Sequence, residues 1–396
     1  MNVLVINAGS SSLKYQLINM VDQQVLCKGQ VERIGIEGSF LKQKGGAEEA
    51  DIHAEIKNHN DAIQMVLEAL TDAKHGVVKS LEEIDAVGHR VLHGGEKFAD
   101  PVLVDEQVIH DLEAIADLGP LHMPANISGI KACQQAMPVP QVAVFDTGFH
   151  QTMPPKAYLY GLPYEVYEKH KVRRYGFHGT SHLFVSQRAA ELRGTEKGRM
   201  ITCHLGNGSS LCAILDGKCM DTSMGLTPLE GVVMGTRSGD MDPAIVKFIM
   251  EKEHKTIEEM DHYLNKESGV YGLSGVSSDF RDLAKAAAEG HRRAILALDV
   301  FIYRIQKYIG AYAAALGGVD TLVFTAGIGE NDAKMRKDIL TGMEWLGIQL
   351  DDEANQQRGE HKISAPDSKV EVWVIPTNEE LVIARETVRL AKQAKA

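Results

Sequence analysis

The chain has 396 residues, of which 44% are hydrophobic and 24% are charged, so its composition excludes a disordered or fibrous protein and is typical of a soluble globular one. Its formal net charge of −12 argues against general binding to nucleic acid or to anionic membranes, although it permits a local basic pocket. The length predicts two domains. Since the N-terminal sequence has neither the basic segment nor the long apolar run of a secretory signal, we expect a cytoplasmic protein.

Two features argue against disulfides and membrane spans. The cysteines are odd in number and never spaced CxxC, so the sequence predicts neither disulfides nor a zinc site. The most apolar stretch, residues 311–328, is interrupted by Asp320 and by glycines and predicts a buried helix, a turn and a strand. The five cysteines are Cys27, Cys133, Cys203, Cys212 and Cys219.

Short runs of mostly β-branched apolar residues, bounded by Gly, Asp or Pro, predict strands along the whole chain. In chain order these runs are 3–7, 15–19, 142–145, 200–205, 211–215, 321–325 and 370–375. Helical patterns lie between them at 61–69, 181–193, 294–316 and 379–395, and the long helix 294–316 is interpreted either as core or as a dimer interface. Strands mixed with helices at this spacing predict an α/β fold.

The two halves of the chain resemble each other weakly. GSSSLKYQL from Gly9 resembles GNGSSLCAIL from Gly206, and VFDTGFH from Val144 resembles VFTAGIGEN from Val323. Two matches in the same order indicate an internal duplication and predict a ligand cleft between the halves.

Three loops have the composition of phosphate-binding turns. NAGSSSLK, residues 7–14, combines backbone N–H groups, hydroxyls and one cation between two strands. Glycines in HLGNGSS, residues 204–210, would let a polyphosphate approach the backbone, and GIGEN, residues 327–331, follows a strand and opens a helix. Each loop alone could be an ordinary turn, but the three together favour a nucleotide; no P-loop motif occurs.

Charged residues in small-residue loops are candidates for chemistry. Arg90, Arg237 and Arg281 could each clamp a carboxylate or phosphate, although a lone arginine more often forms a surface salt bridge. Asp146 follows an apolar strand, where α/β enzymes place functional carboxylates, and could equally cap a turn. His178 precedes a helix whose dipole would keep its imidazole neutral, or it makes an ordinary loop contact.

The start of the last helix contains a second candidate ligand. Thr377 and Glu380 fit a capping box. Glu379 is then either a surface acid favoured by the helix dipole or a ligand that reaches Mg²⁺ through water.

Nine motifs in order resemble the acetate kinase family, from the first predicted strand to the last predicted helix: NAGSSSLK, GHRVLHGG, VFDTGFH, RRYGFHGTSH, HLGNGSS, GTRSGDMDP, SSDFRD, TAGIGEN and PTNEE. The resemblance implies the α/β fold shared by sugar kinases, heat-shock chaperone ATPases and actin, with two duplicated actin-like (ribonuclease H-like) domains flanking a nucleotide cleft. It implies an acyl-substrate and phosphate domain at 1–148, completed by the helix 380–396, and a nucleotide-binding and dimerisation domain at 149–379.

The resemblance also implies a reaction, partners and site positions. The reaction is reversible transfer of the ATP γ-phosphoryl group to acetate, giving acetyl phosphate and ADP, by a homodimer that uses Mg²⁺, which Mn²⁺ could replace. By motif, the catalytic positions are Asp146, His178 and Arg237, and the metal positions are Asn7 and Glu379. The substrate-binding positions are Arg90, Leu92, Leu121, Phe177 and Pro228. The ATP-binding positions are Ser10, Ser12, Lys14, His204, Leu205, Gly206, Asn207, Gly208, Asp279, Phe280, Arg281, Gly327, Ile328, Gly329, Glu330 and Asn331.

The implied chemistry limits the roles of these residues. Acetate is ionised near pH 7 and needs no general base, so we expect Asp146 to orient the metal or Arg237. We also expect Asp240 and Asp242 to hold the Arg237 side chain. Leu92 stands where the family commonly has a valine, and the larger side chain favours acetate over longer acids.

Two alternative functions remain. Propionate kinase is the nearest one, because one methylene changes discrimination by only ~1–3 kcal/mol. An actin-like or chaperone-like ATPase is the alternative from another class, but it would leave GHRVLHGG and FHGTSH without a purpose.

Overall fold

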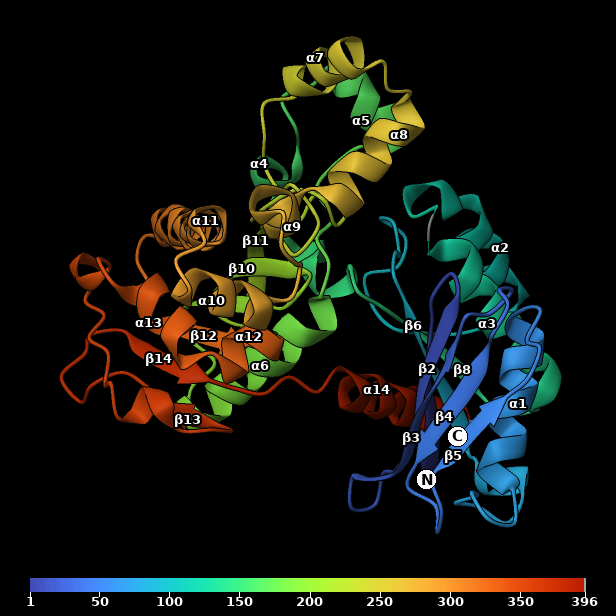
Figure 1. Cartoon of the computed structure of the whole chain (residues 1–396). Coiled ribbons are helices and arrows are strands. Elements are labelled where there is room, and N and C mark those ends of the chain that lie inside the picture. The colour runs from blue at the N-terminus through green and yellow to red at the C-terminus, as the bar shows by residue number, and fades with distance from the viewer. Residues whose placement is uncertain (121, 395–396) are drawn as a thin grey trace. The chain divides into compact units, whose positions relative to one another are not determined.

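The computed structural model describes residues 1–120 and 122–394, and the chain forms two compact units. Unit 1 comprises Met1–Gly148 and Asn378–Ala396, and unit 2 comprises Phe149–Thr377. Each unit is built around its own β-sheet with helices packed on it (Figure 1). Within the described ranges, none of the helices combines the length and the apolar character needed to cross a membrane.

Unit 1 contains an eight-stranded sheet in the order β5-β4-β3-β2-β1-β6-β8-β7. Neighbouring strands β1, β6 and β8 run parallel, while the other pairs are antiparallel. The strands are β1 Asn2–Ala8, β2 Ser12–Asn19, β3 Gln24–Glu32, β4 Phe40–Lys44, β5 Ala50–His53, β6 Ala86–Val91, β7 Val102–Leu103 and β8 Gln141–Phe145.

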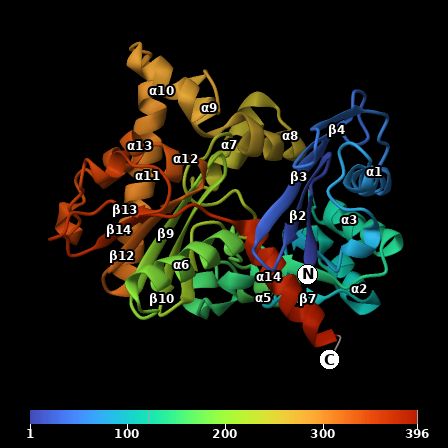
Figure 2. The ribbon, with the colours of Figure 1, turned by 90° about the horizontal axis from the view of Figure 1, so that it is seen from below.

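Both faces of this sheet are covered because the strand side chains are apolar on both sides. Leu4 and Ile6 of β1 pack in one cluster with α1 (His59–Thr71) and α3 (Met123–Ala136). Val3 and Val5 point the other way and pack against α14 (Glu379–Ala394), which Figure 2 shows in red beside these strands. The short helix α2 (Glu106–Ala114) packs on α3.

Unit 2 contains a six-stranded sheet in the order β11-β10-β9-β12-β14-β13. Its strands are β9 Arg199–Leu205, β10 Ser209–Leu215, β11 Lys218–Thr222, β12 Thr321–Thr325, β13 His361–Lys362 and β14 Glu371–Val374, with β9, β12 and β14 parallel. Helix α6 (Gly179–Arg193) packs on one face, and α10 (Phe280–Ala288), α11 (Arg292–Leu316) and α13 (Ala333–Leu340) pack on the other (Figure 1). The remaining helices are α4 Pro155–Tyr158, α5 Tyr164–His170, α7 Ala244–Glu253, α8 Ile257–His262, α9 Gly269–Ser274 and α12 Ala326–Asn331.

The two sheets confirm the predicted duplication and correct one detail of it. The order β3-β2-β1-β6-β8 in unit 1 has the same strand directions as β11-β10-β9-β12-β14 in unit 2. Strands β1 and β2 therefore correspond to β9 and β10, as the first sequence match predicts. The second match is wrong, because VFDTGFH begins at the end of β8, whereas VFTAGIGEN begins at the end of β12. The counterpart of β12 in unit 1 is β6, not β8. Apolar strands that end in small-residue loops recur at several parallel strands, so the pattern alone does not identify which strand it marks.

All predicted strands and helices are present, with ends that differ by a few residues. The predicted capping box is wrong. Asn378 caps α14 by accepting the N–H of Leu381 at 3.1 Å, whereas the hydroxyl of Thr377 bonds Ser181 at 2.8 Å and its N–H donates to Glu330 at 3.1 Å. The amide of Asn378 is one residue closer to the helix and takes the cap.

The two interpretations of the long helix α11 apply to different faces of it. Phe301, Ile305 and Ile309 are fully buried in the core of unit 2, as the core interpretation predicts. Leu296 and Tyr303 are 52% and 59% exposed, so the helix also presents apolar surface. The dimer interface stays a prediction.

Candidate active site

Three predicted site residues of unit 1 lie at the carboxyl ends of its parallel strands. Asn7 is the penultimate residue of β1, Arg90 is the penultimate residue of β6, and Asp146 directly follows β8. Because β1, β6 and β8 are neighbours and parallel, their carboxyl ends meet at one sheet edge, where α/β proteins bind ligands. The sheet topology thus brings together residues that are far apart in the sequence.

Arg90 and Asp146 form a two-pronged ion pair at this edge. Arg90 Nε lies 2.9 Å from Asp146 Oδ1, and Arg90 Nη2 lies 2.5 Å from Asp146 Oδ2. Arg90 Nη1 remains, 3.4 Å from the amide oxygen of Asn7. Asp146 is 0% exposed, so both charges of the pair depend on each other for compensation. Within unit 1 the Asp146 carboxylate holds Arg90, and its expected role in orienting the metal or Arg237 stays a prediction.

The acidic start of α14 adds to the negative field around Arg90. Burial acts to lower the pKa of Arg90, but Asp146, then Glu379 and Glu380, outweigh it and raise that pKa above its ordinary value. Arg90 therefore stays protonated throughout the physiological pH range. The surrounding carboxylates leave a local negative field into which a cation would also fit.

The first phosphate-type loop forms a tight turn between β1 and β2. The N–H of Gly9 donates to the carbonyl of Ser12 at 2.7 Å, and His59 Nε2 bonds the carbonyl of Gly9 at 2.8 Å. A side chain at Gly9 would place its Cβ 3.0 Å from the Ser12 hydroxyl oxygen, which is tighter than ordinary contact. Ser10 in this turn is exposed.

A basic pocket of about 330 Å³ lies on strands β1–β4 of the same unit. Lys14, on β2 directly opposite Asn7 of β1, lines it together with Lys28, Lys42 and Lys44. Cross-strand pairing places Gln30 between Lys14 and Lys42, and Lys28 beside Lys44, so the four lysines share one face of the sheet. The acidic net charge of the chain permits a local basic pocket, and these lysines form one.

In unit 2, His178 lies at the start of α6 with the left-handed backbone conformation φ +58°. Its Nδ1 bonds the hydroxyl of Ser210 at 2.9 Å, and its ring stacks on His204 at 4.1 Å between centroids. Ser210 also bonds Nε2 of His182 at 2.7 Å. Burial, with smaller contributions from His150 and His204, holds the pKa of His182 well below its usual range, so His182 is a neutral support for this hydroxyl. Ser210 is a site residue that the sequence analysis did not single out.

Arg237 and His178 converge on the second phosphate-type loop. A Cβ built at Gly208 would lie 3.5 Å from both Arg237 Nη1 and His178 Nε2. Arg237 Nη1 donates to the carbonyl of Pro228 at 3.1 Å, and burial lowers the pKa of Arg237. Among the described residues, no carboxylate forms an ion pair with Arg237, so its largely desolvated charge is left for an anion.

The predicted support of Arg237 by Asp240 and Asp242 is wrong. Asp240 accepts the N–H of Gly231 at 2.8 Å and the hydroxyl of Tyr308 at 2.6 Å. Asp242 accepts the N–H of Ala244 at 3.0 Å. Both carboxylates therefore accept backbone N–H groups of their own loop, and Asp240 also accepts the Tyr308 hydroxyl.

The loop that carries Arg237 packs directly on the second phosphate-type turn. The N–H of Gly235 donates to the carbonyl of Asn207 at 2.9 Å. A Cβ at Gly235 would lie 1.7 Å from the amide oxygen of Asn207. Any larger residue at 235 would require the Asn207 side chain to move.

A pocket of about 640 Å³ in unit 2 joins the predicted nucleotide loops. It lies where the turn after β9 meets the starts of α10 and α12. Its volume, its apolar Phe280 and Ile328, and its glycine turns suit a nucleotide. The lining residues are Gly206, Asn207, Ser278, Asp279, Phe280, Arg281, Gly327, Ile328, Asn331 and Asp332, of which Ser278 and Asp332 are not among the predicted positions.

Several of the predicted nucleotide positions make contacts that hold these loops in place. Glu330 Oε1 accepts the N–H groups of Ala326 at 2.8 Å and of Thr377 at 3.1 Å, which fixes the turn after β12. Leu205 is buried in the core of unit 2. Arg281 pairs with Asp279 at 2.5 Å and, through hydrogen bonds, lowers the pKa of that carboxyl to about 2. The guanidinium of Arg281 is thus directed to its own loop.

The predicted acyl-binding residues are divided between the units. Leu92, in unit 1, is 9% exposed, and its N–H donates to the side chain of Asn126 at 2.9 Å. The Asn126 amide also donates to the carbonyl of Ala8 at 2.6 Å, a contact that no sequence motif predicted. Phe177, in unit 2, is 1% exposed, and Leu121 lies outside the described residues.

Comparisons with known proteins agree along the whole chain. The acetokinase family model matches residues 2–385. An acetate kinase of Treponema denticola is 62% identical over 99% of this chain and all of the relative, and one of Thermoanaerobacter pseudethanolicus is 60% identical over the full length of both. The crystal structure of Porphyromonas gingivalis acetate kinase matches with a TM-score of 0.95 at 50% identity, covering 98% of this chain and 99% of that one. A propionate kinase from Francisella tularensis matches with a TM-score of 0.92 at 43% identity over the same shares. The chain belongs to the acetokinase family.

Proposed function

We propose that this acetokinase transfers the γ-phosphoryl group of MgATP reversibly to acetate, giving acetyl phosphate and ADP. The observation that carries the proposal is the convergence of Arg237 and His178 on Gly208, at the turn next to the nucleotide-sized pocket. Full-length identity of about 60% to proteins named acetate kinase supports acetate as the acceptor.

In the proposed reaction a carboxylate oxygen of acetate attacks the γ-phosphorus as the bond from phosphorus to the ADP oxygen breaks. No proton is transferred, since acetate is already an anion. Charge spreads over the three equatorial oxygens in the transition state. Arg237, which has no carboxylate partner among the described residues, and His178 would donate hydrogen bonds to these oxygens.

We assign Mg²⁺ binding to Asn7 and Glu379. Amide and carboxylate oxygens are the donors that Mg²⁺ prefers, and Mn²⁺ accepts the same set. The carboxylates that raise the pKa of Arg90 supply a local field of the right sign for a cation. When bound, the ion would neutralise charge on the phosphate oxygens.

We assign the acetate carboxylate to Arg90. Asp146 occupies Nε and Nη2 of this guanidinium, and Nη1 uses one of its two hydrogens on Asn7, so its other N–H is the proposed donor for substrate. Asp146 then acts as a positioning residue that fixes the guanidinium plane. Leu92 would limit acyl length.

The wider assignments follow from the same family relationship. We propose that unit 1 contributes Arg90, Leu92 and the metal residues and unit 2 most of the nucleotide residues, in a cytoplasmic homodimer. The exposed apolar face of α11, which includes Leu296 and Tyr303, is the candidate dimer surface. Tyr303→Glu should shift the sedimentation coefficient towards that of a monomer, whereas an unchanged coefficient would remove this face from the interface.

Propionate kinase is the second candidate, because a protein of that title matches the chain at 43% identity. Both candidates require an acyl acceptor, which an ATPase does not.

Acetate-dependent release of ADP tests the proposal. ADP is coupled to NADH oxidation with and without acetate, and acetyl phosphate is trapped with hydroxylamine. We expect ADP and hydroxamate to form in equal amounts, only when acetate and Mg²⁺ are both present. ADP release at the same rate without acetate would show an ATPase and contradict the proposal.

A further inference from the structure

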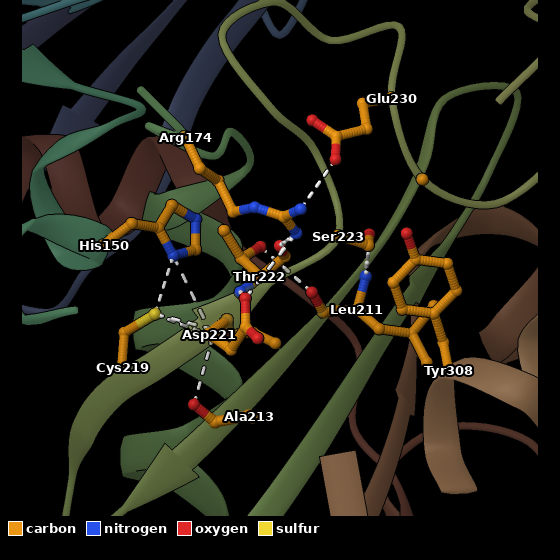
Figure 3. Close-up of polar contacts among 12 residues, drawn as sticks. His150, Arg174, Leu211, Ala213, Cys219, Asp221, Thr222, Ser223, Glu230 and Tyr308 are labelled. Atoms are coloured by element: carbon orange, nitrogen blue, oxygen red, sulfur yellow. Dashed lines mark hydrogen bonds and ion pairs between the residues drawn. The ribbon is translucent and has the colours of Figure 1, made fainter. Parts of the chain in front are cut away.

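A cluster of one histidine and two cysteines lies in the core of unit 2, outside the proposed active site. Figure 3 labels its members His150 and Cys219. His150 is in the turn Gly148–Thr152, Cys212 is on β10, and Cys219 is on the neighbouring strand β11. All three residues are 0% exposed. Although the cysteines are not spaced CxxC, the hairpin brings their sulfur atoms to 3.4 Å from each other.

The histidine ring is oriented with one nitrogen towards both sulfurs. His150 Nδ1 lies 3.2 Å from Cys219 Sγ and 3.9 Å from Cys212 Sγ. His150 Nε2 lies 3.0 Å from the carbonyl oxygen of Phe177, which can only accept a hydrogen bond. The ring hydrogen is therefore on Nε2, and the lone pair of Nδ1 faces the sulfurs. Histidines that bind metals are commonly held in this way by a backbone carbonyl.

We propose that His150 Nδ1, Cys212 Sγ and Cys219 Sγ bind one thiophilic metal ion of the Zn²⁺ or Cu⁺ class. For tetrahedral zinc with bonds of ~2.3 Å to sulfur and ~2.0 Å to nitrogen, ligand atoms lie about 3.5 to 3.8 Å apart. The three separations of 3.2, 3.4 and 3.9 Å bracket this spacing, so binding needs only small side-chain shifts. Thiolate and imidazole ligands select these ions over Mg²⁺.

The two thiols act on each other's pKa in opposite directions. Burial acts to raise the pKa of Cys219, whereas the hydrogen bond that Cys212 donates to its sulfur acts to lower that pKa. Burial and Cys219 raise the pKa of Cys212 well above its usual range. Metal binding would displace thiol protons to solvent, so the affinity should rise with pH.

The neighbouring carboxylate is not a fourth ligand. Asp221 Oδ1 accepts the N–H of Thr222 at 2.8 Å and lies 3.6 Å from Arg174, which also pairs with Glu230 (Figure 3). The site thus supplies three protein ligands. The site is also connected to the proposed active site, because the carbonyl that orients His150 belongs to Phe177, the residue before His178.

Titration of the reduced full-length chain with Co²⁺, a spectroscopic substitute for Zn²⁺, tests the proposal. We expect one equivalent of Co²⁺ to bind with the intense near-ultraviolet absorption of thiolate-to-cobalt charge transfer, and Zn²⁺ to displace it. Competition with a Cu⁺-specific chelator measures the affinity for Cu⁺ separately. Cys212→Ser and Cys219→Ser should each weaken binding at least ~100-fold.

Cys203→Ser is the matched control, since Cys203 is also 0% exposed but lies on β9 in the core cluster on the opposite face of the sheet. This variant should bind the metal as the unsubstituted chain does. The cobalt absorption of the unsubstituted chain needs no variant, and its absence together with a failure to bind Cu⁺ would overturn the proposal. Undiminished binding by folded Cys212→Ser and Cys219→Ser chains would overturn it as well.

Discussion

Arg237 is the residue whose surroundings differ most from those of an ordinary surface arginine. Its guanidinium is largely buried and donates to the carbonyl of Pro228, and no described carboxylate pairs with it. Such a group is desolvated in advance and binds a developing negative charge without reorganisation. Its planar fork can follow three phosphoryl oxygens, which a lysine ammonium cannot.

We therefore expect Arg237→Lys to lower kcat at least ~10²-fold while the KM values for acetate and MgATP change far less. Initial rates across both substrate concentrations measure the two effects separately. Arg188→Lys is a suitable control, because Arg188 pairs with Glu191 and Glu360 and has no proposed role in the site. Near-normal kcat in Arg237→Lys would mean that position 237 supplies only a general positive field.

Arg90 combines a proposed substrate contact with a structural ion pair. Arg90→Ala should raise the KM for acetate strongly and leave the KM for MgATP nearly unchanged. It should also lower the free energy of unfolding by about 3–5 kcal/mol, because it removes the two-pronged ion pair of the buried Asp146 carboxylate. Urea denaturation measures this loss.

The double variant separates these two effects of Arg90. Removing Asp146 as well should recover part of the stability, since no buried charge is then left, but not the KM for acetate. Recovery of both would show that Arg90 acts only through the fold.

Individual contacts of this kind were the least predictable part of the site. The motif around Arg90 indicated a functional arginine, but its pairing with Asp146, 56 residues away, depends on the parallel placement of β6 and β8. The roles of Asn126 and Ser210 also depend on tertiary contacts and have no local signal. The hairpin β10–β11 likewise creates a histidine–cysteine cluster that cysteine spacing does not detect.

At the scale of elements, α14 packs on the sheet of unit 1 and lies especially near one glycine of β6. A Cβ at Gly88 of β6 would lie 2.4 Å from the Thr387 hydroxyl oxygen and 2.7 Å from Ile383 Cγ2, both on α14. These are buried side chains, so the helix or the strand must shift to make room.

Gly88→Ala should accordingly lower the free energy of unfolding by ~1–3 kcal/mol, the usual cost of overpacking. Because α14 begins with Glu379, we also expect a raised KM for Mg²⁺. Gly161→Ala is the control, since a Cβ there meets nothing within 4 Å. Equal stabilities of the two variants would show that α14 adapts without strain.

Secondary structure was more predictable than the contacts it makes. Strands such as β1, β9 and β12 are apolar on both faces and are bounded by turn residues, so local pattern predicts them. Strand β6 was not predicted, because its sequence AVGHRV contains a glycine, a histidine and an arginine. Its identity as a strand comes from the hydrogen bonds that it makes with β1 and β8.

For the molecule as a whole, buried neutral histidines predict how stability depends on pH. Burial lowers the pKa of His89 to about 4, although its hydrogen bond to Gln141 acts to raise it, and burial also holds the pKa of His182 well below its usual range. An unfolded histidine titrates near ~6.5. Between about pH 6.5 and 4 the unfolded state therefore binds more protons, and stability falls as the pH falls.

In this window each such histidine should contribute a loss of about 1.4 kcal/mol per pH unit. Urea denaturation at pH 7, 6 and 5 measures the slope for the whole chain. His89→Gln keeps a hydrogen-bonding side chain but cannot titrate, so its slope should be smaller by about the share of one histidine. Identical slopes would mean that His89 is not neutral in the folded state.

The proposed site residues of each unit lie near the carboxyl ends of its parallel strands. Arg90 is at the end of β6 in unit 1, and Arg237 lies beside the turn that follows β9 in unit 2. Phosphoryl transfer to a short carboxylic acid is tested most directly by comparing acetate, propionate and butyrate as acceptors at saturating MgATP in the coupled assay. The account predicts the highest kcat/KM for acetate, a lower value for propionate and the lowest for butyrate. It also predicts that Leu92→Ala improves propionate relative to acetate by roughly tenfold. A higher kcat/KM for propionate than for acetate, or ADP release that does not depend on any of the three acids, would contradict it.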